Sequence, residues 1–176
     1  MKKEQRKNSA ELQALRLRLN LTDSDLARIF GVTIDTVKNW LRTQFFNGKH
    51  RFKNYAHQDV LDKLNEMLVF IDEVAANSCE VIETKIPAVE NLKINLVAYN
   101  RTDYKKYFTA KERENLPTNK IHLALLAETK LQAESRFKNI EVNICWFIAD
   151  KYESWLRLNN KKDSQQNRAL WTSEFY

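Results

Sequence analysis

The chain has 176 residues, of which 43% are hydrophobic and 30% are charged. This composition is ordinary for a folded globular protein and argues against a disordered chain. No run of apolar residues approaches the roughly 18 that a membrane-spanning helix needs, and the basic N-terminus is not followed by the apolar core of a secretory signal. We therefore predict a cytoplasmic protein with no membrane partner. Gly and Pro occur only twice each, which favours a chain made mainly of helices.

The net charge of +6 is concentrated in the first third of the chain. Residues 1–58 contain 12 Lys and Arg against 5 Asp and Glu, whereas residues 59–176 contain 17 against 18. We therefore predict a basic domain over 1–58 with a polyanion as its partner, and a near-neutral domain over 59–176. The alternative is a basic tail that only keeps the chain soluble, although half of the twelve basic residues lie beyond residue 27.

The first 42 residues predict three short helices. Ser9 can cap the first helix. The apolar side of that helix repeats at helical spacing, at Leu12, Leu15 and Leu19. Thr22 and Asp25 have the spacing of a capping box and predict the start of the second helix. Gly31 ends that helix, because only Gly adopts the left-handed conformation without penalty, and Thr33 caps the third helix.

The spacing within the second and third helices is typical of a helix-turn-helix. Ala27 is small enough to let the two helices approach, and Gly31 supplies the tight turn four residues later. Val37 and Trp40 follow Ala27 by ten and thirteen residues and face inward. With the leucine-rich helix before it, this pattern over about residues 9–60 resembles the lambda-repressor/Cro-like family of DNA-binding domains.

The resemblance implies that the third helix lies in the major groove of duplex DNA, with its N-terminal residues at the base edges. Asn39 can pair with adenine, and Lys38 can donate to guanine or to a phosphate. The predicted DNA-binding residues on or beside this helix are Thr33, Ile34, Asp35, Thr36, Lys38, Asn39 and Arg42. Asp35 could instead serve only as a favourable charge at the helix start. The chain departs from the family after Trp40, where many members have a Glu-x-Gly turn.

Residues 43–55 mix basic and aromatic side chains. We expect the aromatic ones mainly in the core, and we predict that Lys49, Arg51 and Lys53 contact the phosphate backbone beside the groove. Mixtures of this kind also suit single-stranded RNA, because bases can stack on the aromatic rings. An RNA-binding regulator is therefore an alternative interpretation.

A long helical pattern follows over residues 56–77. This helix could pack against its own C-terminal domain or pair with a second copy of itself. Because a lone helix-turn-helix buries little surface and dimers read two half-sites, we predict a homodimer. The residues predicted for dimerisation form one apolar seam: Val60, Leu64, Met67, Leu68 and Ile71.

The rest of the chain predicts a small α+β portion. Apolar residues alternate over 92–98 and 140–146, as in two strands that can pair with each other or with a second subunit. Helices are expected over about 102–108, 117–133 and 149–158, and no element is predicted for the polar and then aromatic tail. The predicted fold class is therefore mainly α, with an N-terminal helix-turn-helix bundle, a long linking helix and a C-terminal α+β portion with a small sheet.

The order of these elements, with the segment LVAYNRTDYKKYF at residues 96–108, also resembles the YdiL-like regulators, a group related to some anti-CRISPR-associated repressors. That resemblance implies a dimeric repressor of a nearby operon whose C-terminal portion serves dimerisation. Some of these relatives also bind RNA.

Enzyme chemistry is not predicted. The chain has no glycine-rich phosphate loop, and its three His show no metal-ligand spacing. Cys145 lies in an apolar strand, which favours packing over nucleophilic chemistry, so we predict no cofactor and no metal. We expect four aromatic residues either to pack in the core or to line an effector pocket: Trp146, Tyr152, Trp155 and Trp171.

The sequence therefore predicts a homodimeric, sequence-specific regulator that binds double-stranded DNA and acts as a repressor. An antitoxin-like module that binds a partner protein and regulates its own gene is the main alternative, together with the RNA-binding regulator.

Overall fold

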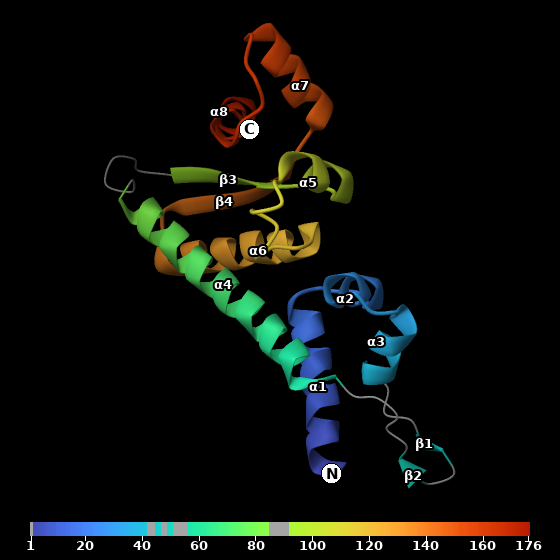
Figure 1. The fold of residues 1–176 in the computed structure, drawn as a ribbon. Coiled ribbons are helices and arrows are strands. Elements are labelled where there is room, and N and C mark those ends of the chain that lie inside the picture. The colour runs from blue at the N-terminus through green and yellow to red at the C-terminus, as the bar shows by residue number, and fades with distance from the viewer. Residues whose placement is uncertain (1, 42–44, 47–48, 51–55, 85–91) are drawn as a thin grey trace.

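The computed structural model of the chain describes residues 2–41, 45–46, 49–50, 56–84 and 92–176. Over these ranges the chain forms eight α-helices, a short antiparallel strand pair and one two-stranded parallel sheet (Figure 1). The mainly helical fold class is confirmed, with short N-terminal helices, the long helix α4 and a small sheet in the C-terminal half. Among the described helices, none is both long enough and apolar enough to cross a membrane.

Helix α1 (Lys2–Arg18) begins at Lys2, whereas the sequence predicted a helix capped by Ser9. Ser9 therefore lies inside the helix, and its predicted role as an N-cap is wrong. The physical reason is that the residues before it are mostly Lys, Glu, Gln and Arg, which form helices readily and contain no breaker. The Ser9 hydroxyl instead donates to the carbonyl of Leu41 at 3.4 Å, across to the end of the third helix.

The turns around α2 (Asp23–Phe30) and α3 (Ile34–Leu41) have the predicted chemistry. The Thr22 hydroxyl accepts from the Asp25 amide at 3.2 Å, and the Asp25 carboxylate accepts from the Thr22 amide at 3.0 Å. Gly31 ends α2 in the left-handed conformation, at a φ of +64°. The Thr33 hydroxyl accepts from the Thr36 amide at 3.2 Å and so caps α3. The capping box, the glycine turn and the second cap are all confirmed.

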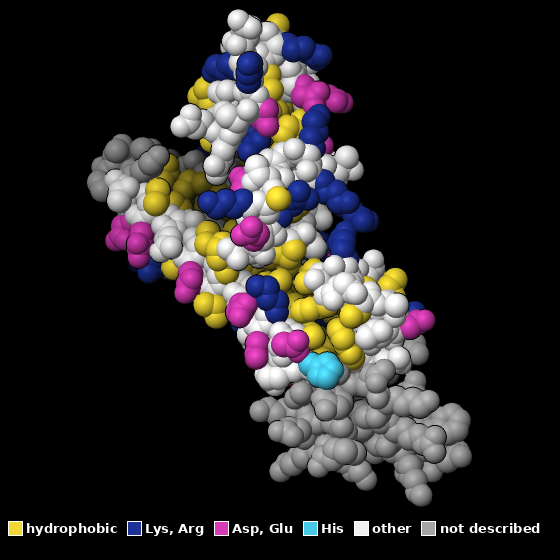
Figure 2. Space-filling view, in the orientation of Figure 1, with side chains coloured by type: hydrophobic (Ala, Val, Ile, Leu, Met, Phe, Trp, Pro, Cys, Tyr) yellow, Lys and Arg dark blue, Asp and Glu magenta, His cyan; other side chains and the backbone are white. Residues whose placement is uncertain are grey.

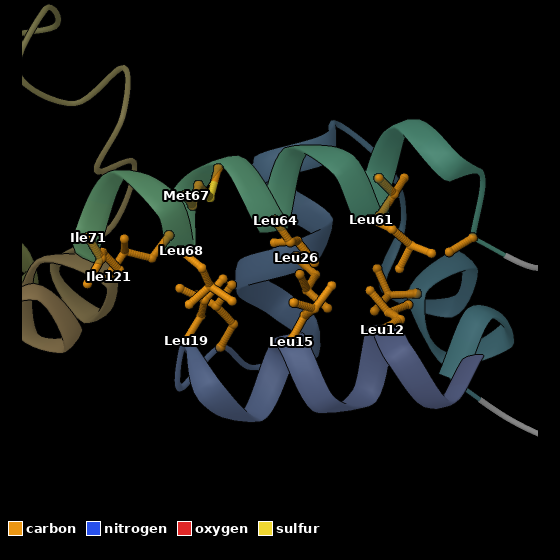
Figure 3. Close-up of a cluster of buried hydrophobic side chains, with 14 of the residues drawn as sticks. Leu12, Leu15, Leu19, Leu26, Leu61, Leu64, Met67, Leu68, Ile71 and Ile121 are labelled. Atoms are coloured by element: carbon orange, nitrogen blue, oxygen red, sulfur yellow. The ribbon is translucent and has the colours of Figure 1, made fainter. Parts of the chain in front are cut away.

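Helix α4 (Gln58–Glu83) is the longest helix and extends six residues beyond its predicted end. Its first half lies along α1 and α2, where leucines from all three helices interdigitate (Figure 3). The same cluster continues to Ile121 of the later helix α6, beside Ile71 of α4. The predicted domain boundary between residues 58 and 59 therefore lies within one continuous hydrophobic cluster.

The parallel sheet pairs β3 (Leu92–Ala98) with β4 (Ile140–Trp146), with Leu92 opposite Ile140 and Ala98 opposite Trp146. Both strands have their predicted bounds, and they pair within one chain. Helices α5 (Arg101–Tyr107) and α6 (Asn119–Arg136) lie between them in sequence. Side chains from the end of α4, from α6 and from the sheet form a second cluster: Cys79, Ile82, Ala133 and Val142.

A third cluster is aromatic and joins the sheet to the last two helices, α7 (Ala149–Leu158) and α8 (Gln165–Phe175). Its buried members are Tyr99, Tyr104, Tyr107, Phe147, Tyr152 and Trp171. Helix α8 was not predicted; Ser164 caps it, and Trp171 anchors it at 1% exposure. Four aromatic residues were predicted either to form the core or to line an effector pocket. Of these, Tyr152 and Trp171 are in the core, Trp155 packs against the cluster, and Trp146 is exposed.

Candidate nucleic-acid interface

Helix α3 is held against α2 by its apolar side. Val37 is fully buried and Trp40 is 6% exposed. The Trp40 ring meets the Phe30 ring of α2 edge-on, with the centroids 6.3 Å apart and the planes at 76°. Ala27 is also buried at this contact, as its small size predicts. Because large rings and a tight glycine turn fix α3 on one side, the direction of its opposite side is also fixed.

The opposite side of α3 presents polar groups to solvent. Thr33, Asp35 and Asn39 are exposed, Ile34 is 44% exposed, and Thr36 and Lys38 are half-buried. The Thr33 and Thr36 hydroxyls lie 2.9 Å apart, and the Lys38 ammonium lies 3.7 Å from the Asp35 carboxylate. Within the described residues the Asn39 amide has no hydrogen-bond partner. The structure thus brings six of the predicted DNA-binding residues to one helix and its cap.

The structure does not describe the side chains of the other predicted DNA-binding residues. Arg42, Arg51 and Lys53 lie outside the described residues. Lys49 belongs to the strand β2 (Lys49–His50), which pairs with β1 (Phe45–Phe46), and only its backbone is described. Their phosphate contacts remain predictions.

The five residues predicted for dimerisation are covered within a single chain. Val60, Leu64, Met67, Leu68 and Ile71 are between 0% and 6% exposed. Leu64 and Leu68 point toward the leucines of α1, and Ile71 lies beside Ile121 (Figure 3). The apolar seam of α4 is therefore corrected to a core seam, because the chain's own helices occupy the surface that a second copy would need. A homodimer would have to use other residues.

Asp25 lies where α2 meets the C-terminal half of the chain and is 7% exposed. Its carboxylate accepts from Arg28 at 2.7 Å and from Lys120 of α6 at 2.8 Å. Burial alone would raise the pKa of this carboxyl, but hydrogen bonds from Lys120 and Thr22 outweigh burial and hold the pKa below its usual value. Asp25 is therefore an ionised anchor between the two halves.

A second basic surface was missed by the sequence analysis. Arg28 of α2, Arg101 and Lys105 of α5, and Arg113 line one cavity of about 120 Å³, together with the start of α6. The net charge of residues 59–176, which is close to zero, concealed this cluster. The spacing of Arg101 and Lys105, four residues apart on one helix, is a signal that could have indicated a shared face.

A larger cavity of about 460 Å³ lies between β3, α6 and α8. His122 and Arg168 contribute to its wall, whereas none of the four aromatic residues considered for an effector pocket does. His122 is 8% exposed, and burial lowers its pKa to about 4. The imidazole is therefore neutral at physiological pH.

Within the residues that the structure describes, no three His, Cys, Asp or Glu side chains gather as a metal site would require. No model of a known protein family matches this chain, and no curated protein matches it either. The function is accordingly inferred from the geometry of α3 and from the distribution of charge.

Proposed function

We propose that the protein is a sequence-specific, double-stranded DNA-binding transcriptional regulator that acts as a repressor, with α3 as its recognition helix. The observation that supports this most directly is the two-sided character of α3. Val37 and Trp40 are buried against α2, while Asp35 and Asn39 of the same eight-residue helix and Thr33, its cap, are exposed. A polar helix face on a rigid base suits insertion into the major groove, which is about 12 Å wide.

The side chains of this face match the chemistry of base edges. The Asn39 amide can donate to and accept from adenine at the same time. Lys38 can reach guanine or a phosphate if its ion pair with Asp35 breaks. That pair is solvent-accessible and 3.7 Å long, so breaking it costs little free energy. The Thr33 hydroxyl and the first turn of α3 can approach a phosphate. The +7 charge of residues 1–58 favours approach to DNA in general.

We propose that the regulator acts as a homodimer in the cytoplasm, where it meets DNA. Two copies of α3 about 34 Å apart would read successive major-groove half-sites, and linking two modest affinities would raise the total affinity. Repression would follow from occlusion of a promoter. Since the core seam of α4 is covered, the contact between copies would use surface outside it.

The test is a selection from a random duplex pool at near-physiological salt, followed by titration of the enriched sequence with Asn39→Ala. The variant should weaken binding to that sequence by about 1–3 kcal/mol, roughly 5- to 150-fold, because one two-pronged base contact is lost. Asn77→Ala is the matched control, since Asn77 is an exposed asparagine on α4, at the end of that helix remote from α3 (Figure 1).

A two-fold symmetric motif that Asn39→Ala loses and Asn77→Ala retains would support both the recognition helix and the dimer. Equal binding by both variants, with unfolding curves showing that both are folded, would refute the assignment of α3. Absence of any enriched duplex, with tighter binding to a structured RNA at the same salt concentration, would replace DNA with RNA as the ligand.

A further inference from the structure

The small cavity between α2, α5 and the start of α6 has an unusual charge. Its wall contains four cationic side chains, Arg28, Arg101, Lys105 and Arg113, and no carboxylate. These residues come from three separate segments that folding brings together. Figure 2 shows Lys and Arg side chains gathered at the level of α5, above α2. Like charges held around one volume repel each other, so a bound anion would stabilise this arrangement.

The cations of this cavity are poorly compensated by the protein itself. Arg28 donates to Asp25 at 2.7 Å, but Asp25 also accepts from Lys120. Among the described residues, the Arg113 side chain donates only to the carbonyl of Thr109, at 3.3 Å. Arg101 and Lys105 are exposed, and within the described residues neither has a hydrogen bond or an ion pair. Most of the positive charge is therefore available to a ligand.

The start of α6 forms part of the wall of the same cavity. Pro117, Thr118 and Asn119 line it, and α6 continues for 18 residues from Asn119. The first amide groups of a helix have no carbonyl partner within it and carry partial positive charge. Thr118 satisfies one of them, by accepting from the Ile121 amide at 3.3 Å. The others add to the field of the four cationic side chains.

The cavity, of about 120 Å³, has room for a small oxyanion. Arg is suited to such a ligand, because its planar fork donates two parallel hydrogen bonds to phosphate oxygens. Three arginines and one lysine around this cavity suit a phosphate group, whose oxygens can accept from several of them at once.

We infer that this cavity binds a backbone phosphate of the DNA duplex that α3 reads, an inference that rests on the proposed function. Arg28 belongs to α2, the helix that holds α3 in place, so the cavity and the recognition helix are carried by one packed unit. Helix α5 lies on the opposite side of α2 from α3 (Figure 1). The contact with DNA thus extends from the N-terminal helices onto the C-terminal half of the chain.

The experiment compares two double variants that remove the same charges. Arg101→Gln with Lys105→Gln removes the two unpaired cations of the cavity. Arg136→Gln with Lys138→Gln removes one Arg and one Lys that are also exposed, at the far end of α6 and just beyond it. Binding of each protein is titrated over a range of salt concentrations, to the selected duplex and to an unrelated duplex.

The cavity variant should bind both duplexes roughly tenfold more weakly than wild type, because a lost phosphate contact is independent of sequence. The slope of log K against log salt concentration should decrease in magnitude by about 1, the value for one phosphate. The control variant should keep the wild-type slope. Equal slopes for the two variants would overturn the inference.

Inorganic phosphate separates this inference from the proposed function. At matched ionic strength, phosphate should raise the melting temperature of the wild type and the control, relative to chloride, by more than it raises that of the cavity variant, because general stabilisation by phosphate is common to all three proteins. Stabilisation by phosphate without any effect of the cavity variant on duplex binding would assign the cavity to a free phosphate and overturn the DNA contact. A refutation of α3 through Asn39→Ala would be seen independently, since Asn39 is not part of the cavity.

Discussion

The ammonium group of Lys120 in α6 donates to the carboxylate of Asp25 in α2 at 2.8 Å, across 95 positions of sequence. The same carboxylate completes the capping box of α2 with Thr22 and accepts from Arg28. A single side chain therefore starts the helix that supports α3 and ties that helix to the C-terminal half.

We expect Lys120→Met to lower the free energy of unfolding by about 1 kcal/mol, because a charged partner of a largely buried carboxylate is lost. Asp25→Asn should cost about 2 kcal/mol, since it weakens the cap as well as both ion pairs. Urea unfolding at pH 7 measures both values. In a double-mutant cycle the two residues should show a coupling of about 1 kcal/mol.

Lys63→Met is the control for this cycle, because Lys63 forms only an exposed pair with Glu66 on α4, and it should change stability by less than about 0.5 kcal/mol. Because the pKa of Asp25 is lowered by folding, its contribution is complete above the pKa of the unfolded state and is lost as the pH falls through the folded-state pKa. A coupling near zero at pH 7 would show that the bridge does not tie the two halves together.

A second prediction concerns His122, whose ring lies 5.0 Å from Phe108, 5.6 Å from Tyr104 and 5.8 Å from Tyr99 between ring centroids. Burial lowers the pKa of His122 from 6.5 to about 4, so the unfolded state binds a proton that the folded state excludes. The free energy of unfolding should therefore decrease by about 2 kcal/mol between pH 7 and pH 5.

Denaturant unfolding at the two pH values measures this decrease, and His122→Phe should remove most of it. Asn77→Ala, at an exposed position on α4, is the control and should leave the pH dependence as in the wild type. If His122→Phe retained the full decrease between pH 7 and pH 5, the source would be another group and not the buried imidazole.

A third prediction distinguishes core from dimer on α4. Leu64 is fully buried between the helices of its own chain. Leu64→Ala should lower the free energy of unfolding by about 2–5 kcal/mol through lost burial and a residual cavity. The loss should be the same at low and at high protein concentration, because the contact is made within one chain.

Val69→Ala on the same helix is the matched control, since Val69 is 54% exposed and its truncation should cost less than about 1 kcal/mol. A destabilisation by Leu64→Ala that appeared only at concentrations where the protein is dimeric would restore the interface assignment for this seam.

Local chemistry accounts for most of the elements that were predicted correctly. The Thr22 and Asp25 spacing, the glycine turn at Gly31 and the alternation in the two strands each depend on neighbours within a few residues. Helix α8 was missed because its apolar residues are few: Ala169, Leu170 and Trp171 are contiguous, and Phe175 alone follows at helical spacing. That helix is held by Trp171 in a cluster assembled from distant segments, which no local pattern reveals.

In the candidate site, too, local patterns were predictable from the sequence and tertiary contacts were not. The outward face of α3 was predictable, because buried Val37 and Trp40 alternate with polar residues at helical spacing. The apolar stripe of α4 indicated that one side is covered, but it could not indicate whether α1 or a second copy covers it. The cavity around Arg101 and Lys105 and the bridge to Lys120 depend on tertiary contacts alone.

Helix α4 contributes to two of the hydrophobic clusters, with Leu61 near one end and Ile82 near the other. As an unbroken helix of 26 residues it is about 39 Å long, so it can act as a stiff lever between them. A tilt of about 5° around one end of such a lever displaces the other end by roughly 3 Å, on the order of half a helical turn. A ligand that moved the sheet and α6 would therefore also move α1 and the helices packed on it.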